Sequence, residues 1–116
     1  RACFVVFQAG AAAAREFLAH REEILAGVGR HYFGAAMPVA TRRKKAKDLF
    51  NAMDNDGTVY DWLRREGMPT DIPPARFAVG HEGRVFDLDA YEQSRADMTA
   101  EFQALMPGMY ALGSRL

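Results

Sequence analysis

Apolar residues recur with helical spacing in the first third of the chain. From Ala11 onward, large apolar side chains return every three or four positions with glutamates between them, and they are Phe17, Leu18, Ile24, Leu25 and Val28. This spacing is typical of an amphipathic helix, and glycine often follows the last turn of one. We therefore expect a helix from Ala11 that ends near Gly27 or Gly29. Residues 29–40 are then predicted to form a connection, with His31, Tyr32 and Phe33 folded onto the core.

A second helix is predicted from Thr41 onward. Thr41 is a candidate N-cap, and the apolar positions that follow it at i, i+3, i+4 and i+7 spacing are Ala46, Leu49, Phe50 and Met53. The polar run 54–57 ends this helix.

A third, short helix is marked at both ends. Thr58 and Asp61 have the spacing of a capping box, and Gly67 with Pro69 stops the helix. Its buried stripe is expected to be Val59, Trp62 and Leu63.

The remainder of the chain predicts a β-hairpin and a last helix. Residues 76–79 and 84–88 are short strand-like runs around a four-residue turn, Gly80 to Gly83. Asp87 or Asp89 can cap the last helix, which Pro107 and Gly108 end; its apolar residues are Tyr91, Met98, Phe102 and Leu105.

The first residues form a separate apolar run. Ala2 to Phe7 is strand-like in content, and Gly10 marks its end. The whole pattern predicts an α+β, mostly α fold of about four helices with one small hairpin. We expect one domain over residues 1–116. Within it, residues 1–40 form an apolar segment, a helix and a connection, residues 41–93 a helix-turn-helix with the hairpin, and residues 89–116 the last helix and a tail.

The composition is that of a folded chain with no net charge and therefore no strong overall electrostatic field. The 116 residues are 49% hydrophobic, and 15 Lys and Arg balance 15 Asp and Glu. Enough core material is present for one domain, and no net charge draws the protein toward nucleic acid or anionic lipid.

Cysteine content and hydropathy bear on the compartment. Cys3 is the single cysteine, so an internal disulfide is excluded and an intracellular reducing compartment, either the cytosol or an organelle matrix, is favoured. The apolar stretch from Ala2 to Ala14 is interrupted by Gln8 and is shorter than the roughly 18 residues of a membrane span, so no transmembrane segment is expected. Because the chain begins with Arg1, we expect processing or truncation.

No catalytic or metal site is predicted. If Gly57 took the sixth position of a calcium loop, the twelfth would be Leu63, which leaves only Asp54 and Asp56 as ligands. Three of the glycines, at positions 27, 29 and 34, follow a helix, whereas a dinucleotide loop follows a strand. The three histidines, at positions 20, 31 and 81, have no paired ligand spacing. We expect no enzyme activity and no cofactor.

One dense basic run stands out. It lies in the first turns of the second predicted helix and consists of Arg42, Arg43, Lys44, Lys45 and Lys47. Cations are disfavoured at a helix N-terminus unless an anion compensates them, so a phosphate backbone or an acidic protein surface is a candidate partner. The alternative is a solvated face on which Lys44 pairs with Asp48.

Residues 44–93 resemble a known DNA-binding architecture. The order of helix, turn, short helix, hairpin and helix is similar to the winged helix-turn-helix of phage excisionases, MerR-type regulators and small terminase subunits. The residues that carry the resemblance are Thr58, Val59, Tyr60, Trp62, Gly67, Met68, Pro69, Phe77, Gly80, Gly83, Arg84, Val85, Phe86, Asp87 and Tyr91. It implies that the short helix enters the major groove, with Asp61, Arg64 and Arg65 near DNA, Arg84 on the wing and 42–45 near phosphates.

Two functions remain as hypotheses. Acids at positions 54, 56 and 61 would repel phosphate, and both ends of the chain are apolar. We therefore favour a non-enzymatic interaction module, an accessory or scaffold subunit of a larger protein assembly that binds other subunits through its ends. The candidate interface residues are Phe4, Phe7, Met106, Met109, Tyr110 and Leu112. Nucleic acid remains the alternative partner, contacted through the basic run together with Arg64, Arg65 and Arg84.

Overall fold

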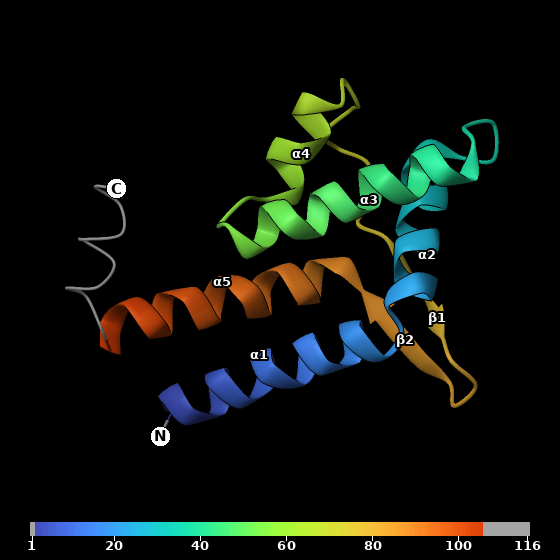
Figure 1. Ribbon diagram of the computed structural model, residues 1–116. Coiled ribbons are helices and arrows are strands. Elements are labelled where there is room, and N and C mark those ends of the chain that lie inside the picture. The colour runs from blue at the N-terminus through green and yellow to red at the C-terminus, as the bar shows by residue number, and fades with distance from the viewer. Residues whose placement is uncertain (1, 106–116) are drawn as a thin grey trace.

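The computed structural model describes residues 2–105, with side chains described from residue 10 onward. The elements, in chain order, are α1 (Ala2–Ala19), α2 (Arg21–Phe33), α3 (Val39–Asp54), α4 (Val59–Arg65), β1 (Arg76–Val79), β2 (Arg84–Asp87) and α5 (Leu88–Leu105) (Figure 1). The fold is α+β and mostly α, as predicted, but the described residues form five helices instead of four.

The prediction for the N-terminal run is wrong. Residues 2–7 are helical, and Gly10 lies inside α1 instead of ending a strand. Alanine, the strongest helix former, occupies positions 11–14 and favours extending the helix through the β-branched and aromatic residues before it.

The single helix expected from Ala11 is also wrong. The chain breaks at His20 between α1 and α2, and α2 continues past Gly27 and Gly29 to Phe33. These two glycines are buried or half-buried because other elements approach them closely. A β-carbon at Gly27 would lie 2.5 Å from the Phe77 ring, and one at Gly29 would lie 3.0 Å from the carbonyl oxygen of Arg42. They serve helix packing and not helix termination.

Helix α3 begins two residues before the predicted cap. Its first residue is Val39, and Pro38 occupies the N-cap position, so Thr41 is not the cap. The Pro38 carbonyl accepts a hydrogen bond from the Arg42 N–H at 3.0 Å. Proline fits this position because its ring fixes φ and its missing N–H removes no helical bond.

The boundaries of α4 follow the predicted cap. The Thr58 hydroxyl accepts a hydrogen bond from the Asp61 N–H at 3.1 Å. The Val59 N–H donates to the Glu92 carboxylate on α5 at 2.5 Å. Two hydrogen bonds therefore stabilise the start of this short helix, one from its own N-cap and one from a different helix.

The hairpin and the cap of α5 are confirmed. Strands β1 and β2 pair antiparallel with Phe77 opposite Phe86, and the loop between them is the predicted 80–83. The Asp87 carboxylate accepts from the Ala90 N–H at 3.1 Å, which identifies Asp87 as the cap of α5.

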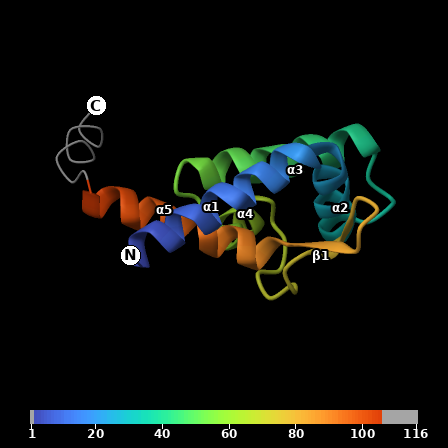
Figure 2. The same ribbon diagram turned by 90° about the horizontal axis from the view of Figure 1, so that it is seen from below.

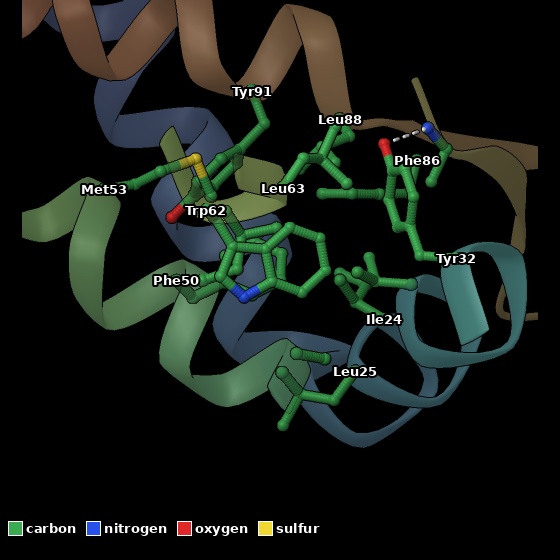
Figure 3. Packing of buried hydrophobic residues seen from close by; sticks show 14 of the residues in the cluster. Ile24, Leu25, Tyr32, Phe50, Met53, Trp62, Leu63, Phe86, Leu88 and Tyr91 are labelled. Carbon is green, nitrogen blue, oxygen red and sulfur yellow. Dashed lines mark hydrogen bonds between the residues drawn. The ribbon is translucent and has the colours of Figure 1, made fainter. Parts of the chain in front are cut away.

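The core lies where α2, α3, α4, the hairpin and the first turn of α5 meet (Figure 3). Its largest fully buried side chains are Trp62, Ile24, Leu25, Leu49, Leu88, Val28 and Val79. The Tyr32 hydroxyl accepts a hydrogen bond from the Ala75 N–H at 3.2 Å inside this core. Of the predicted aromatic cluster, Tyr32 is buried and Phe33 packs against the core, while His31 is exposed.

Helices α1 and α5 form a separate region of the molecule. They lie side by side and run in opposite directions, and they extend away from the core toward the end where the N-terminus lies (Figures 1 and 2). We call this pair the α1/α5 arm.

Candidate interaction surface

The α1/α5 arm is joined to the core by aromatic contacts at its base. The Phe17 ring stacks on Phe50 of α3 with centroids 4.4 Å apart and lies 5.8 Å from the ring of Tyr91. Tyr91 also contacts Phe50 edge-on at 5.4 Å. The base of the arm is therefore continuous with the core.

Beyond this base, the arm has little core of its own. The buried residues of α5 are Leu88 and Tyr91, both near its start, while the helix continues to Leu105, which is 68% exposed. The distance from Tyr91 to Leu105 is about 20 Å at the helical rise of about 1.5 Å per residue. Among the described side chains of α1, Gly10 is buried where it meets Met98. Among the described side chains, those of α5 beyond Tyr91 are thus half-buried or exposed.

Helix α1 is apolar around most of its circumference. Its sequence contains no charged residue from Ala2 to Ala14. The position of Gly10 against Met98 and the contact of Phe17 with Tyr91 define the face that meets α5. Of the described positions, 11, 14 and 18 fall on a different face of a helix with 3.6 residues per turn; Ala11 and Ala14 are half-buried there, and Leu18 is 70% exposed. At Leu18 the arm therefore leaves an apolar side chain exposed beside the face that α5 meets.

The predicted protein-interface residues fall partly outside the described range. Phe4 and Phe7 belong to the helical backbone of α1, but their side chains are outside the described set. The other four interface residues lie beyond residue 105 and outside the described residues; they are Met106, Met109, Tyr110 and Leu112.

Two cations of the predicted basic run are already neutralised. Arg43 Nε and a second guanidinium nitrogen donate to the two Glu22 carboxylate oxygens at 2.7 and 2.8 Å. This hydrogen bonding lowers the pKa of Glu22 and raises that of Arg43. Lys45 Nζ donates to both Glu66 carboxylate oxygens at 3.0 and 2.8 Å. The run is therefore not one uniform positive surface.

The other cations of this run differ in exposure. Lys44 and Lys47 are exposed, as on the solvated face of the alternative interpretation, but the ion pair of Lys44 with Asp48 that belonged to it is not among the described ion pairs. Arg42 is half-buried where α2 meets α3, and its Nε is buried without a hydrogen-bond partner in the described structure. Lys44 and Lys47 are thus the members most open to an external anion.

The two arginines of α4 remain accessible. The Arg64 guanidinium lies over the Tyr60 ring, 5.8 Å from its centroid, and both side chains are exposed. Arg65 is exposed and lines a polar groove of about 430 Å³ between α3 and α4, together with Asn51 and Asn55. The short helix thus presents two cations beside the exposed Asp61.

The hairpin loop is docked on the break between α1 and α2. The Gly80 N–H donates to Glu23 at 3.0 Å, and Arg84 donates to Glu16 at 2.7 Å. The Gly80 hydrogen bond is the main reason that the pKa of Glu23 is lowered. A β-carbon at Gly80 would lie 3.0 Å from the His20 ring. The wing cation predicted from the resemblance, Arg84, is therefore ion-paired within the molecule.

The remaining candidate polar residues are dispersed. Asp54 accepts from Arg95 at 2.6 Å, and His31 Nε2 lies 2.7 Å from the Pro73 carbonyl oxygen. Among the side chains that the structure describes, residues 10–105, no group of three His, Asp or Glu is placed to hold a metal ion. None of the helices in the same range of the chain is long and apolar enough to cross a membrane.

Comparisons with protein-family models, curated proteins and solved structures yield no match to this chain.

Sequence reasoning missed one concentration of positive charge. Arg30 and Arg76 are 46 positions apart in sequence, yet they line the same groove between α2 and β1. Neither residue belongs to a charge run, and Arg30 falls where a connection was expected instead of a helix. Only the register of α2 against the hairpin brings them together.

Proposed function

We propose that this protein is a non-enzymatic interaction module, an accessory subunit that binds another protein through the α1/α5 arm. The observation that carries the proposal is the exposure of two leucines, Leu18 and Leu105, on an arm whose helix α1 is apolar over most of its sequence. A helix that is apolar on most sides is normally buried on most sides. Here α5 meets one face of α1, and among the described side chains α5 has no fully buried residue after Tyr91.

The energetic argument concerns the far end of the arm. Most helix stability in proteins comes from burying an apolar face rather than from helix propensity. Exposed leucines mark both ends of the arm, Leu18 near the core and Leu105 at the far end. A partner helix or sheet laid along α1 would gain about 25 cal/mol per Å² of apolar surface removed from water.

Site-specific photo-crosslinking in the source cells tests this proposal. Benzoylphenylalanine at position 18 and at position 105 should capture the same protein, while the equally exposed Val39 on α3 provides the matched control position. The purified captured protein should then form a complex of fixed stoichiometry with this chain. Leu18→Glu together with Leu105→Glu should abolish that complex, and Val39→Glu should not.

Three outcomes would contradict the proposal. Crosslinks could appear from position 39 as readily as from the arm, or the arm could crosslink only to a second copy of this chain. A third outcome combines two results: analytical ultracentrifugation shows that the purified chain is a monomer, and neither arm position forms a crosslink in cells. Each result would remove the accessory-subunit function.

DNA binding is the second candidate, favoured by the order of α3, α4, hairpin and α5 and by the exposed Arg64 and Arg65. The resemblance to winged helix-turn-helix domains supports it, whereas the docked loop and the ion pairs of Arg43, Lys45 and Arg84 weaken it. A gel-shift series with duplex DNA should show affinity that falls steeply with salt, and Arg64→Ala with Arg65→Ala should flatten the slope by roughly one unit per lost phosphate contact. No shift at low salt would exclude this function.

A further inference from the structure

A groove of about 460 Å³ separates α2 from the outer edge of β1. From α2 it is lined by Ala26, Gly27 and Arg30, and from β1 by Arg76, Phe77 and Ala78. The absent side chain at Gly27 lets the Phe77 ring lie directly against the helix. The groove therefore has an apolar floor of small and aromatic groups with arginines at its rim.

The strand edge that borders this groove is open. The described sheet has two strands, so β1 pairs on one side only. The Leu88 N–H donates to the Ala75 carbonyl at 2.9 Å, and hydrogen-bonded pairs alternate along an antiparallel ladder. Because Ala75 and Leu88 form a hydrogen-bonded pair, the next two positions of β1 that face away from β2 are Arg76 and Ala78. Their N–H and C=O groups point to the open edge of β1, which borders the groove. In the described structure these groups have no backbone hydrogen bond to another element.

The groove is also short of negative charge. Arg30 and Arg76 are exposed and form no ion pair with any described residue. The acid on its lining, Glu23, is already engaged, because one carboxylate oxygen accepts from the Gly80 N–H and the other lies 3.5 Å from His20. Two arginines beside an open strand edge match an acidic extended chain.

We propose that this groove binds an extended acidic peptide segment of a partner protein, which adds to β1 as a third strand. Arg76 and Ala78 would supply two donors and two acceptors to its backbone. Side chains alternate between the faces of a strand, so residues of the peptide on the α2 side would meet Phe77, Ala26 and Arg30, and acidic residues on the opposite face would meet Arg76. This surface is separate from the α1/α5 arm and does not depend on the function proposed for the arm.

Fluorescence anisotropy with a defined probe tests the proposal. The probe is a fluorescein-labelled pentapeptide in which valine and glutamate alternate, titrated with the full chain. We expect saturable binding that weakens with salt. The same peptide methylated at alternate backbone nitrogens should bind at least about tenfold more weakly, because it cannot donate to the strand edge. A valine and lysine peptide should not bind.

Matched variants locate the site. Arg30→Gln and Arg76→Gln should each weaken binding about tenfold, the cost of one charge-assisted hydrogen bond. Arg64→Gln, an exposed arginine on α4, is the control and should leave affinity unchanged. Amide chemical-shift changes on adding peptide should concentrate in α2 and β1. They should persist in the Leu18→Glu and Leu105→Glu arm variants.

Several results would overturn the proposal. One is absence of peptide binding at millimolar concentration by a chain whose circular dichroism shows the native helix content. Others are equal affinity for the methylated peptide, an effect of Arg64→Gln equal to that of Arg30→Gln, or shifts confined to the arm. Binding of a single-stranded oligonucleotide at the same arginines without peptide binding would assign the groove to nucleic acid instead.

Discussion

The sulfur of Met98 on α5 occupies the space that a side chain at Gly10 on α1 would need. The two helices can approach closely here because one of them presents only a hydrogen atom. This contact, with the Phe17 to Tyr91 contact at the base, sets which face of α1 meets α5 and which face remains open.

Gly10→Leu should force the two helices of the arm apart. Overpacking of this kind costs about 1–3 kcal/mol, and we expect a corresponding fall in the free energy of unfolding measured with urea. Adding Met98→Ala should restore some of the loss, because it removes the colliding atoms. The control is Ala12→Leu, an exposed position on the same helix. Equal destabilisation by the control variant would disprove the close contact.

Tyr32→Phe should lower the free energy of unfolding, because it removes the hydroxyl oxygen that accepts a hydrogen bond from Ala75. The buried Ala75 N–H would lose its partner, which costs about 1–3 kcal/mol in the free energy of unfolding. Tyr91→Phe is the matched control, because Tyr91 is equally buried but its hydroxyl has no hydrogen bond among the described residues. Burial raises the pKa of both tyrosines, so both remain protonated at neutral pH. An equal effect of the two substitutions would argue against the Tyr32 hydrogen bond.

The Lys45 and Glu66 pair should contribute more to stability than an exposed pair. Its side chains are 29% and 19% exposed, whereas Arg43 and Glu22 are 42% and 65% exposed. A double-mutant cycle with Lys45→Gln and Glu66→Gln should give a coupling energy of about 1–2 kcal/mol, and the same cycle on Arg43 and Glu22 less than about 1 kcal/mol. The reverse order of the two coupling energies would contradict this prediction.

Acid should release the docked hairpin loop. Because its folded-state pKa lies below the ordinary value of 4.5, the Glu23 contribution is present above that pH and is lost as the pH falls through the lowered pKa. The difference in unfolding free energy between wild type and Glu23→Gln should therefore be largest near neutral pH and shrink below pH 4.5. A constant difference for Glu23→Gln across this range would rule out the loop anchor.

The features that sequence predicted correctly depend on neighbouring residues. Thr58 caps α4 through Asp61, three positions away, and Asp87 caps α5 in the same manner. Gly80 and Gly83 both adopt positive φ in the hairpin loop, a conformation that favours glycine at the ends of a short turn. Such signals lie within four residues of the structure they specify.

The features that sequence missed depend on distant partners. Gly27 and Gly29 resemble helix stops in sequence, but they are the points at which the Phe77 ring and the α3 backbone approach α2. The acids that neutralise Arg43 and Lys45 are each 21 positions away, beyond any spacing within one helix. The predicted positive surface was therefore overestimated, and the groove at Arg30 and Arg76 was not visible at all.

Pairing the first helix with the last constrains the order in which the molecule can assemble. The arm closes only after the roughly 70 intervening residues have come together, and closure of such a long loop is slow compared with local helix formation. During synthesis α1 emerges before α5, so this apolar helix lacks its partner until the roughly 70 residues between them have been made. A newly made chain is therefore most dependent on chaperones, and most prone to aggregate, through its N-terminal helix.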